Sequence, residues 1–130
     1  ASAGFTSGQP WLPLHPDHAG RNAAAQRGDP GSVLSTYRDV IALRRRSPVL
    51  QAGDMDLPEQ PHAKVLSYRR SLGDASVQVL LNMSPQPQRW PAGAERHLLY
   101  GTHPGRPAEL EDGEILLAPH EGLVLGNEPG

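Results

Sequence analysis

Proline and glycine interrupt the chain along its whole length: fourteen of each occur among 130 residues. A proline fixes φ and lacks an N–H group, and a glycine weakens the interior of a helix or strand. Long regular elements are therefore disfavoured, and the composition favours short strands and many turns over a helical bundle. The combined content stays below the level that is typical of disordered chains.

One segment, residues 29–46, predicts a helix. Asp29 stands where an N-cap belongs, and Pro30 follows at the first helical position. Ser47-Pro48 ends the helix, because the residue before a proline avoids the α region. Apolar residues at helical spacing form a stripe along it: Val33, Leu34, Tyr37, Val40 and Ile41. One helix cannot bury this stripe alone, so we expect it to pack on a sheet, on missing neighbours or in a dimer.

From residue 48 onward the chain changes to short apolar runs that are separated by turns. Residues 76–82 are apolar enough for a central strand, and Gly73-Asp74 joins them to residues 65–70 as a hairpin. Further short strands are expected at residues 97–100, 114–118 and 122–125. We predict a mainly β fold, a small antiparallel β-sandwich over residues 48–130. A loop segment (1–28) and the amphipathic helix (29–47) precede it.

Charge and composition exclude several classes of partner. The net charge is −2, and Arg44-Arg45-Arg46 is the one basic run, placed where cations favour a helix C-terminus. We therefore expect no nucleic-acid partner. No apolar run approaches the roughly 20 residues of a membrane span, so no membrane partner is expected. The absence of cysteine excludes disulfides and fits a cytoplasmic location.

The run from Gly4 to Leu14 holds two glycines, two prolines and two of the six aromatic residues, Phe5 and Trp11. Its prolines exclude a regular helix or a central strand. A rigid loop of this kind is expected to pack on a large surface or to border a pocket. Phe5 and Trp11 are therefore candidate substrate-binding residues, since aromatic faces stack on sugar rings, although both could simply pin the loop in place.

This run, Gly-Phe-Thr-Ser-Gly-Gln-Pro-Trp-Leu-Pro, resembles a loop late in the catalytic barrel of α-glucosidases and oligo-1,6-glucosidases, members of the α-amylase family (glycoside hydrolase family 13). Asp29-Pro30-Gly31-Ser32 and the basic end of the helix are similar to the start and end of the family's last barrel helix. Leu117-Ala118-Pro119-His120-Glu121-Gly122-Leu123-Val124 is similar to a closing motif of its C-terminal β domain.

The resemblance implies that residues 1–28 match the end of a (β/α)8 barrel, residues 29–47 its last helix, and residues 48–130 the C-terminal β domain. The parent would be a retaining α-glucosidase that hydrolyses terminal α-linked glucose. The family's catalytic Asp, Glu and Asp lie upstream of the matched segment, so this chain is expected to be inactive alone and to stabilise the barrel. The alternative is a stand-alone carbohydrate-binding or interaction module without enzymatic activity.

The chain's own residues agree with the expectation of no catalytic site. Retaining glycoside hydrolysis needs two carboxyl groups about 5 Å apart, one of them with a raised pKa. The candidate carboxylates lie in turn-like segments that favour solvation: Asp54, Asp56, Glu109, Glu111, Asp112 and Glu114.

Metal and cofactor sites are not expected either. The spacing of His15, Asp17 and His18 does not match a metal-binding motif, because no further ligand follows at a suitable distance in the sequence. The remaining histidines are scattered. Three partners remain as predictions: the missing barrel, a second copy in a homodimer, and oligosaccharide bound through the parent enzyme.

Overall fold

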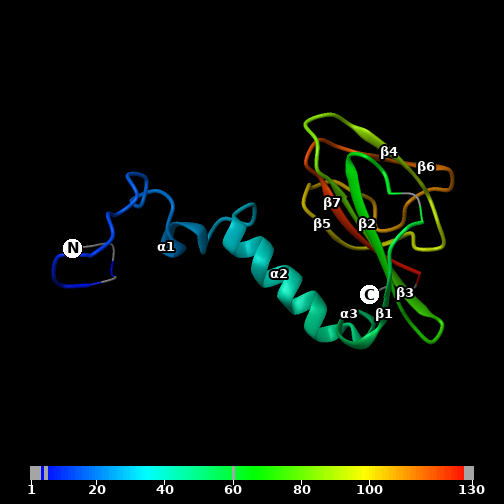
Figure 1. Cartoon of the computed structure of the whole chain (residues 1–130), viewed down its shortest axis with the longest axis horizontal. Coiled ribbons are helices and arrows are strands. Elements are labelled where there is room, and N and C mark those ends of the chain that lie inside the picture. Colours follow the sequence, from blue (N-terminus) through cyan, green and yellow to red (C-terminus); the bar gives the residue numbers. More distant parts are fainter. Residues whose placement is uncertain (1–3, 5, 60, 128–130) are drawn as a thin grey trace. The chain divides into compact units, whose positions relative to one another are not determined.

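The computed structural model describes residues 4, 6–59 and 61–127 (Figure 1). These residues form two compact units that divide between Asp39 and Val40. The first unit contains α1 (Ala23–Gln26) and the first half of α2 (Val33–Arg46), and the second contains everything that follows. Phe5 lies outside the described residues.

Helix α2 begins at Val33, so the predicted start at Pro30 is wrong. Asp29 caps a local turn instead of the helix: its Oδ1 accepts a hydrogen bond from the amide of Gly31 at 2.9 Å. Its carbonyl oxygen accepts a second bond, from the amide of Ser32 at 3.1 Å. Because asparagine and aspartate side chains close such turns readily, the helix starts only after this turn is complete.

The first turn of α2 is capped by two side chains. Ser32 Oγ accepts from the amide of Ser35 at 3.2 Å, and Gln26 Oε1 accepts from the amide of Leu34 at 2.9 Å. Free amides at a helix start need such acceptors. Helix α1 is thereby tied to α2 through the Gln26 side chain, and both ends of this link lie in the first unit.

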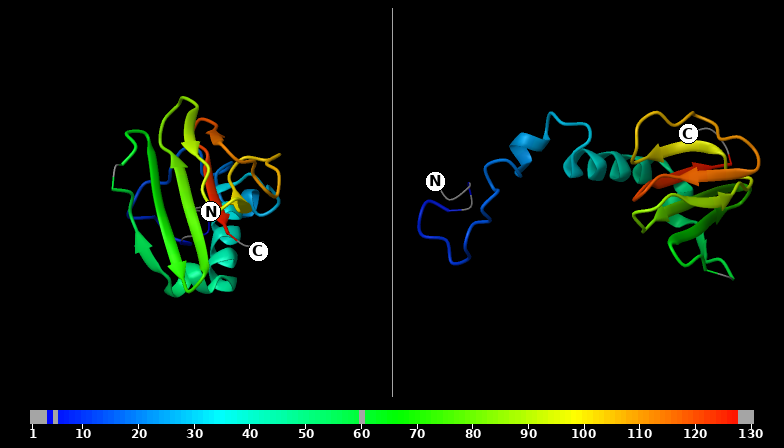
Figure 2. Two further views of the ribbon diagram at one scale, coloured as in Figure 1. Left: turned by 90° about the vertical axis from the view of Figure 1, so that its right-hand side faces the viewer. Right: turned by 90° about the horizontal axis from the view of Figure 1, so that it is seen from above.

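The second unit is an antiparallel β-sandwich, which confirms the predicted mainly β fold (Figure 1). Within the described residues, one sheet has five strands in the order β1-β2-β3-β7-β5, and β4 pairs with β6 in a second sheet. Figure 2 (left) shows the long β2–β3 hairpin in green. The strands are β1 (Asp54–Asp56), β2 (Val65–Leu72), β3 (Ala75–Asn82), β4 (Gln88–Pro91), β5 (His97–Gly101), β6 (Glu114–Leu117) and β7 (Gly122–Gly126).

The main core lies between the two sheets. Four leucines from β3, β6 and β7 are fully buried in it: Leu80, Leu117, Leu123 and Leu125. Val65, Leu110 and Ile115 complete this cluster, and Trp90 of β4 packs against it. Because side chains alternate across a strand, the same strands also present apolar residues on their other face.

That other face carries a second apolar cluster of Val49, Val77 and Val79. Val49 belongs to the short helix α3 (Pro48–Ala52), which Ser47 caps and which covers one end of the sheet. Gly53 allows this close approach, since a Cβ there would lie 2.6 Å from the carbonyl oxygen of Val49. The rest of this face, here called the open sheet face, comprises Leu66, Tyr68, Leu81, Leu99 and Val124, which are half-buried or exposed.

Candidate functional site

The predicted aromatic pair is not assembled by the described residues. Phe5 lies outside them, and the Trp11 side chain is 91% exposed. Because the indole is almost fully solvated, it packs little against the rest of its unit. A role for Trp11 in binding sugar stays a prediction.

The histidine and aspartate residues near the N-terminus bind one another. His15 Nδ1 contacts the Asp17 carboxylate, whose other oxygen lies 3.3 Å from Arg21 Nε. His18 Nδ1 instead contacts the backbone oxygen of His15 at 2.8 Å. Among the described residues, no group of three histidine, cysteine, aspartate or glutamate side chains is arranged to hold a metal ion.

The six carboxylates that the sequence suggested are all exposed: Asp54, Asp56, Glu109, Glu111, Asp112 and Glu114. Three of these carboxylates pair with arginines at the surface. Arg89 Nη1 lies 2.6 Å from Glu114 Oε2, and Arg96 pairs with Asp112 and more distantly with Glu109. Such solvated surface pairs contribute little to stability and do not form the closely spaced carboxyl pair that retaining hydrolysis needs.

Two other acids are buried, and the sequence did not single them out as such. Glu121 is 1% exposed and accepts from Arg106 Nε at 2.8 Å, from Arg106 Nη2 at 2.5 Å and from the amide of Ala118 at 2.7 Å. Burial opposes ionisation of this carboxyl, but the bonds from Arg106 and Ala118 outweigh it and hold the pKa of Glu121 below its ordinary value. The same pairing raises the pKa of Arg106. Glu121 is therefore a buried, ionised anchor rather than a proton donor.

Glu95, 4% exposed, is the second buried acid. Its Oε1 lies 2.6 Å from Arg69 Nε and accepts from Ser76 Oγ at 2.5 Å. The amide of Ser76 donates to Asn127 Oδ1 at 2.8 Å, so the network joins the β2–β3 hairpin to the end of β7. This arrangement holds strands together and uses the Glu95 carboxylate in an ion pair with Arg69.

Each of the two units leaves most of its own part of the apolar stripe of α2 uncovered. Tyr37 and Ile41 are 66% and 48% exposed, whereas Leu43 is buried. Ile41 and Leu43 are two residues apart, which places them about 200° apart around the helix axis. The helix therefore buries the side that carries Leu43, and the stripe lies on a different, exposed side.

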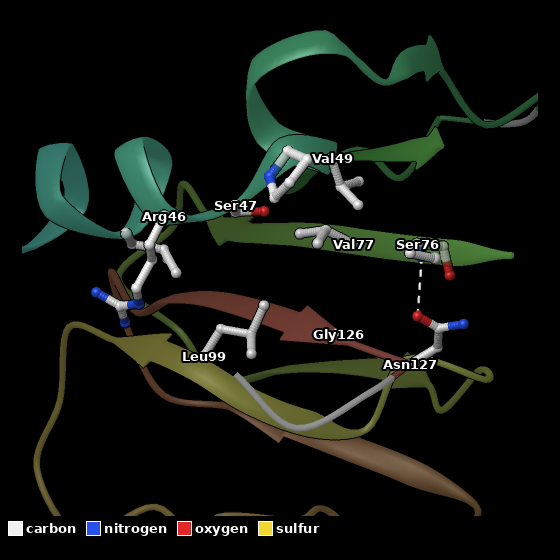
Figure 3. A pocket seen from close by; sticks show the side chains of 11 residues that line it. Arg46, Ser47, Val49, Ser76, Val77, Leu99, Gly126 and Asn127 are labelled. Atoms are coloured by element: carbon white, nitrogen blue, oxygen red, sulfur yellow. Dashed lines mark hydrogen bonds between the residues drawn. The ribbon is translucent and has the colours of Figure 1, made fainter. Parts of the chain in front are cut away.

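A hollow of about 270 Å³ lies between the end of α2, α3 and the sheet (Figure 3). Val49, Val77 and Leu99 surround it, with Arg46 at one end and Asn127, bonded to Ser76, at the other (Figure 3). It contains no carboxylate, and the described residues offer Arg46 no ion pair there. This hollow suits packing by an apolar side chain better than it suits chemistry.

A second hollow, here called the Trp90 hollow, lies where β1, β2, β3 and β4 meet and has a volume of about 190 Å³. It shares Leu57, Pro58 and Ser67 with a neighbouring hollow of about 360 Å³ around His62. Its wall combines an indole with hydroxyl, amide and carboxylate groups. Its lining residues are Asp56, Leu57, Pro58, Ser67, Tyr68, Arg69, Gln78 and Trp90.

Comparison with known proteins supports the family that the sequence suggested. A probable α-glucosidase of Rhizobium meliloti is 41% identical over 83 residues, which is 64% of this chain and 15% of that protein. A probable oligo-1,6-glucosidase 2 of Bacillus subtilis is 32% identical over 130 residues, 95% of this chain and 22% of that protein. No family model matches the chain.

A solved structure, the trehalulose synthase MutB from Pseudomonas mesoacidophila MX-45, superimposes with a TM-score of 0.86 at 30% identity. The match covers 96% of this chain and 23% of that one. No helix among the described residues is both long and apolar enough to cross a membrane. The chain spans about a fifth of the proteins it matches, or less. It belongs to the α-amylase family, glycoside hydrolase family 13, and corresponds to the C-terminal region of its α-glucosidases and oligo-1,6-glucosidases.

Proposed function

We propose that this chain is the C-terminal part of an α-glucosidase-like hydrolase, in which it packs against the catalytic barrel and stabilises it. The parent enzyme would hydrolyse terminal α-linked glucose from short oligosaccharides with retention. The chain itself would be non-catalytic, because each acid in its described residues is either solvated or, like Glu95 and Glu121, ion-paired with an arginine. We place the enzyme in the cytoplasm, which the cysteine-free sequence favours.

The observation that carries the proposal is the uncovered apolar stripe of α2, to which the open sheet face adds a second apolar surface. A helix with a sustained apolar stripe normally buries it, and contiguous exposed apolar surface marks an interface. Covering the exposed half of each large apolar side chain would contribute about 1 kcal/mol per residue. A barrel wall that covers both surfaces would thus contribute several kcal/mol.

A chimera tests this proposal. The matching 22% of the Bacillus subtilis relative is replaced by this chain, and turnover of a chromogenic α-glucoside is measured with thermal stability. We expect an active, folded chimera. Ile41→Glu on the stripe should abolish most of that activity, and Ala42→Glu, the adjacent exposed control, should preserve it. Equal effects of both substitutions would contradict packing through the stripe.

Two measurements on the isolated 130-residue chain test the non-catalytic role and the predicted homodimer. No turnover of the same α-glucoside is expected, and turnover that survives stringent purification would refute the non-catalytic role. Sedimentation tests the homodimer: a dimer dissociated by Ile41→Glu but not by Ala42→Glu would assign the stripe to a second copy instead of the barrel.

A further inference from the structure

The Trp90 hollow is built from strands that are far apart in sequence but adjacent in the sandwich. Ser67 is opposite Leu80, and Arg69 is opposite Gln78, in the β2–β3 register. Ser67 and Arg69 share a strand face with Val65, which belongs to the core between the sheets. Their side chains therefore lie on the face that looks toward β4 and Trp90.

The indole that forms one wall is held in place. Trp90 packs against the main core, and the His62 ring meets it edge-on with centroids 6.2 Å apart. His62 is itself oriented, because its Nδ1 accepts from the amides of Lys64 at 3.1 Å and Val65 at 3.0 Å. A fixed, half-buried aromatic ring offers a ligand a rigid apolar surface at little entropic cost.

Three polar side chains of the hollow, other than Arg69, lack partners among the described residues. Ser67 is 4% exposed, yet its hydroxyl makes no hydrogen bond to any residue that the structure describes. The Gln78 amide and the Asp56 carboxylate are likewise without partners among the described side chains. Ser67 Oγ is not among the fully buried side-chain atoms without a partner in the described residues, so this hydroxyl is open to the hollow and free to bond to a ligand there.

The charges of the hollow exclude an anionic ligand. Arg69 is the cation in its lining, and its guanidinium already pairs with Glu95 at 2.6 Å and donates to Ser76 Oγ at 3.1 Å. Asp56 adds an uncompensated negative charge at the rim. Phosphate and carboxylate ligands would therefore meet net repulsion, while neutral ligands with several hydroxyl groups would not.

We propose that the Trp90 hollow binds a ring of a neutral sugar, with one face of the ring on Trp90. Ser67, Gln78 and Asp56 would form hydrogen bonds to its hydroxyl groups. An apolar wall with a few convergent polar groups is typical of small-molecule sites, and a hydroxyl-rich ring can use donors and acceptors alike. The choice of a glucose-containing sugar as the ligand rests on the proposed function. The inference that the hollow binds a neutral, hydroxyl-rich ring rests on its lining residues alone.

The test uses the intrinsic fluorescence of the full chain. Trp11 and Trp90 are its two tryptophans, so Trp11→Phe leaves Trp90 as the single reporter. Titration with isomaltose should give a saturable change with a dissociation constant on the order of millimolar. Ser67→Ala should weaken binding about three- to ten-fold, the loss of one neutral hydrogen bond. It should not lower the unfolding midpoint, because the hydroxyl it removes has no protein partner.

Ser71→Ala is the matched control, on the same face of β2 but outside the hollow, and should leave binding unchanged. Absence of a saturable change, or equal weakening by both alanine variants, would overturn the proposal. Choline binding that Asp56→Asn removes and Ser67→Ala does not would overturn it too, by assigning the hollow to a cation. The assay reads binding rather than turnover or barrel packing, so its failure is distinct from failure of the proposed function.

Discussion

Replacing Arg106 by methionine would remove the partner of a carboxylate that is 1% exposed. Glu121 would lose its two bonds from the guanidinium and keep only the bond from the Ala118 amide. Arg106 also donates to the carbonyl oxygen of Leu116 at 2.5 Å, so it ties the loop after β5 both to β6 and, through Glu121, to the β6–β7 turn. Arg106→Met therefore leaves a buried charge without compensation and releases this loop.

The expected loss of unfolding free energy differs between the two single substitutions, because water reaches the remaining partner to a different extent in each. Removing one partner of a buried ion pair typically costs about 3–5 kcal/mol, and Arg106→Met should fall in this range. Glu121→Gln should cost about 1–3 kcal/mol, because the Arg106 side chain is 22% exposed and water can reach it. The double variant has neither charge. It should cost at least about 2 kcal/mol less than the sum of the single variants.

The pH dependence gives a second check on the same pair. The folded-state pKa of Glu121 lies below its ordinary value of 4.5, so its contribution to stability is present above that pH. It is lost as the pH falls through the folded-state pKa. Without Arg106, burial raises the pKa of Glu121, and protonation relieves the penalty at higher pH. The stability gap between the native chain and Arg106→Met should therefore narrow as the pH falls from 7 toward 4.

Urea unfolding of the 130-residue chain, followed by circular dichroism at several pH values, measures both effects. A domain of this size has roughly 5–15 kcal/mol of stability, so a native stability at the low end of that range would leave Arg106→Met unfolded. In that case, recovery of a cooperative transition in the double variant would itself reveal the coupling. Costs that add within about 0.5 kcal/mol, or a gap that does not change with pH, would refute the reasoning.

Four further substitutions, one of them a control, test the packing and the caps. Gly53→Ala should cost about 1–3 kcal/mol in urea unfolding, because the new Cβ would lie 2.6 Å from the Val49 carbonyl oxygen. Leu80→Ala, in the fully buried core, should cost about 2–5 kcal/mol, whereas Leu116→Ala, exposed on β6, should change the midpoint little. Gln26→Ala removes the acceptor for the second amide of α2 and should cost about 1 kcal/mol, seen as lost helical signal; an unchanged signal would contradict the cap.

Residues that are neighbours in the sequence were sufficient to predict where the helix ends and where the hairpin turns. Ser47-Pro48 was predicted to end the helix, and α2 ends at Arg46. The hairpin at Gly73-Asp74 is confirmed, with Gly73 at a φ of 59°. These features depend on backbone conformations that particular residues allow or forbid, so they can be derived from neighbours in sequence. β4 was missed because prolines flank it, but it lies in a two-stranded sheet where a terminal Pro91 is tolerated.

The sequence by itself thus determined the fold class, most strand positions and the family. Only the tertiary structure decided which acids are buried: Glu121 and Glu95 look no different in sequence from the exposed carboxylates. Their arginines stand 15 and 26 positions away, and the Trp90 hollow likewise draws on four strands. Burial and pairing are properties of residues brought together across the sandwich. A one-dimensional pattern does not contain the distances that set them.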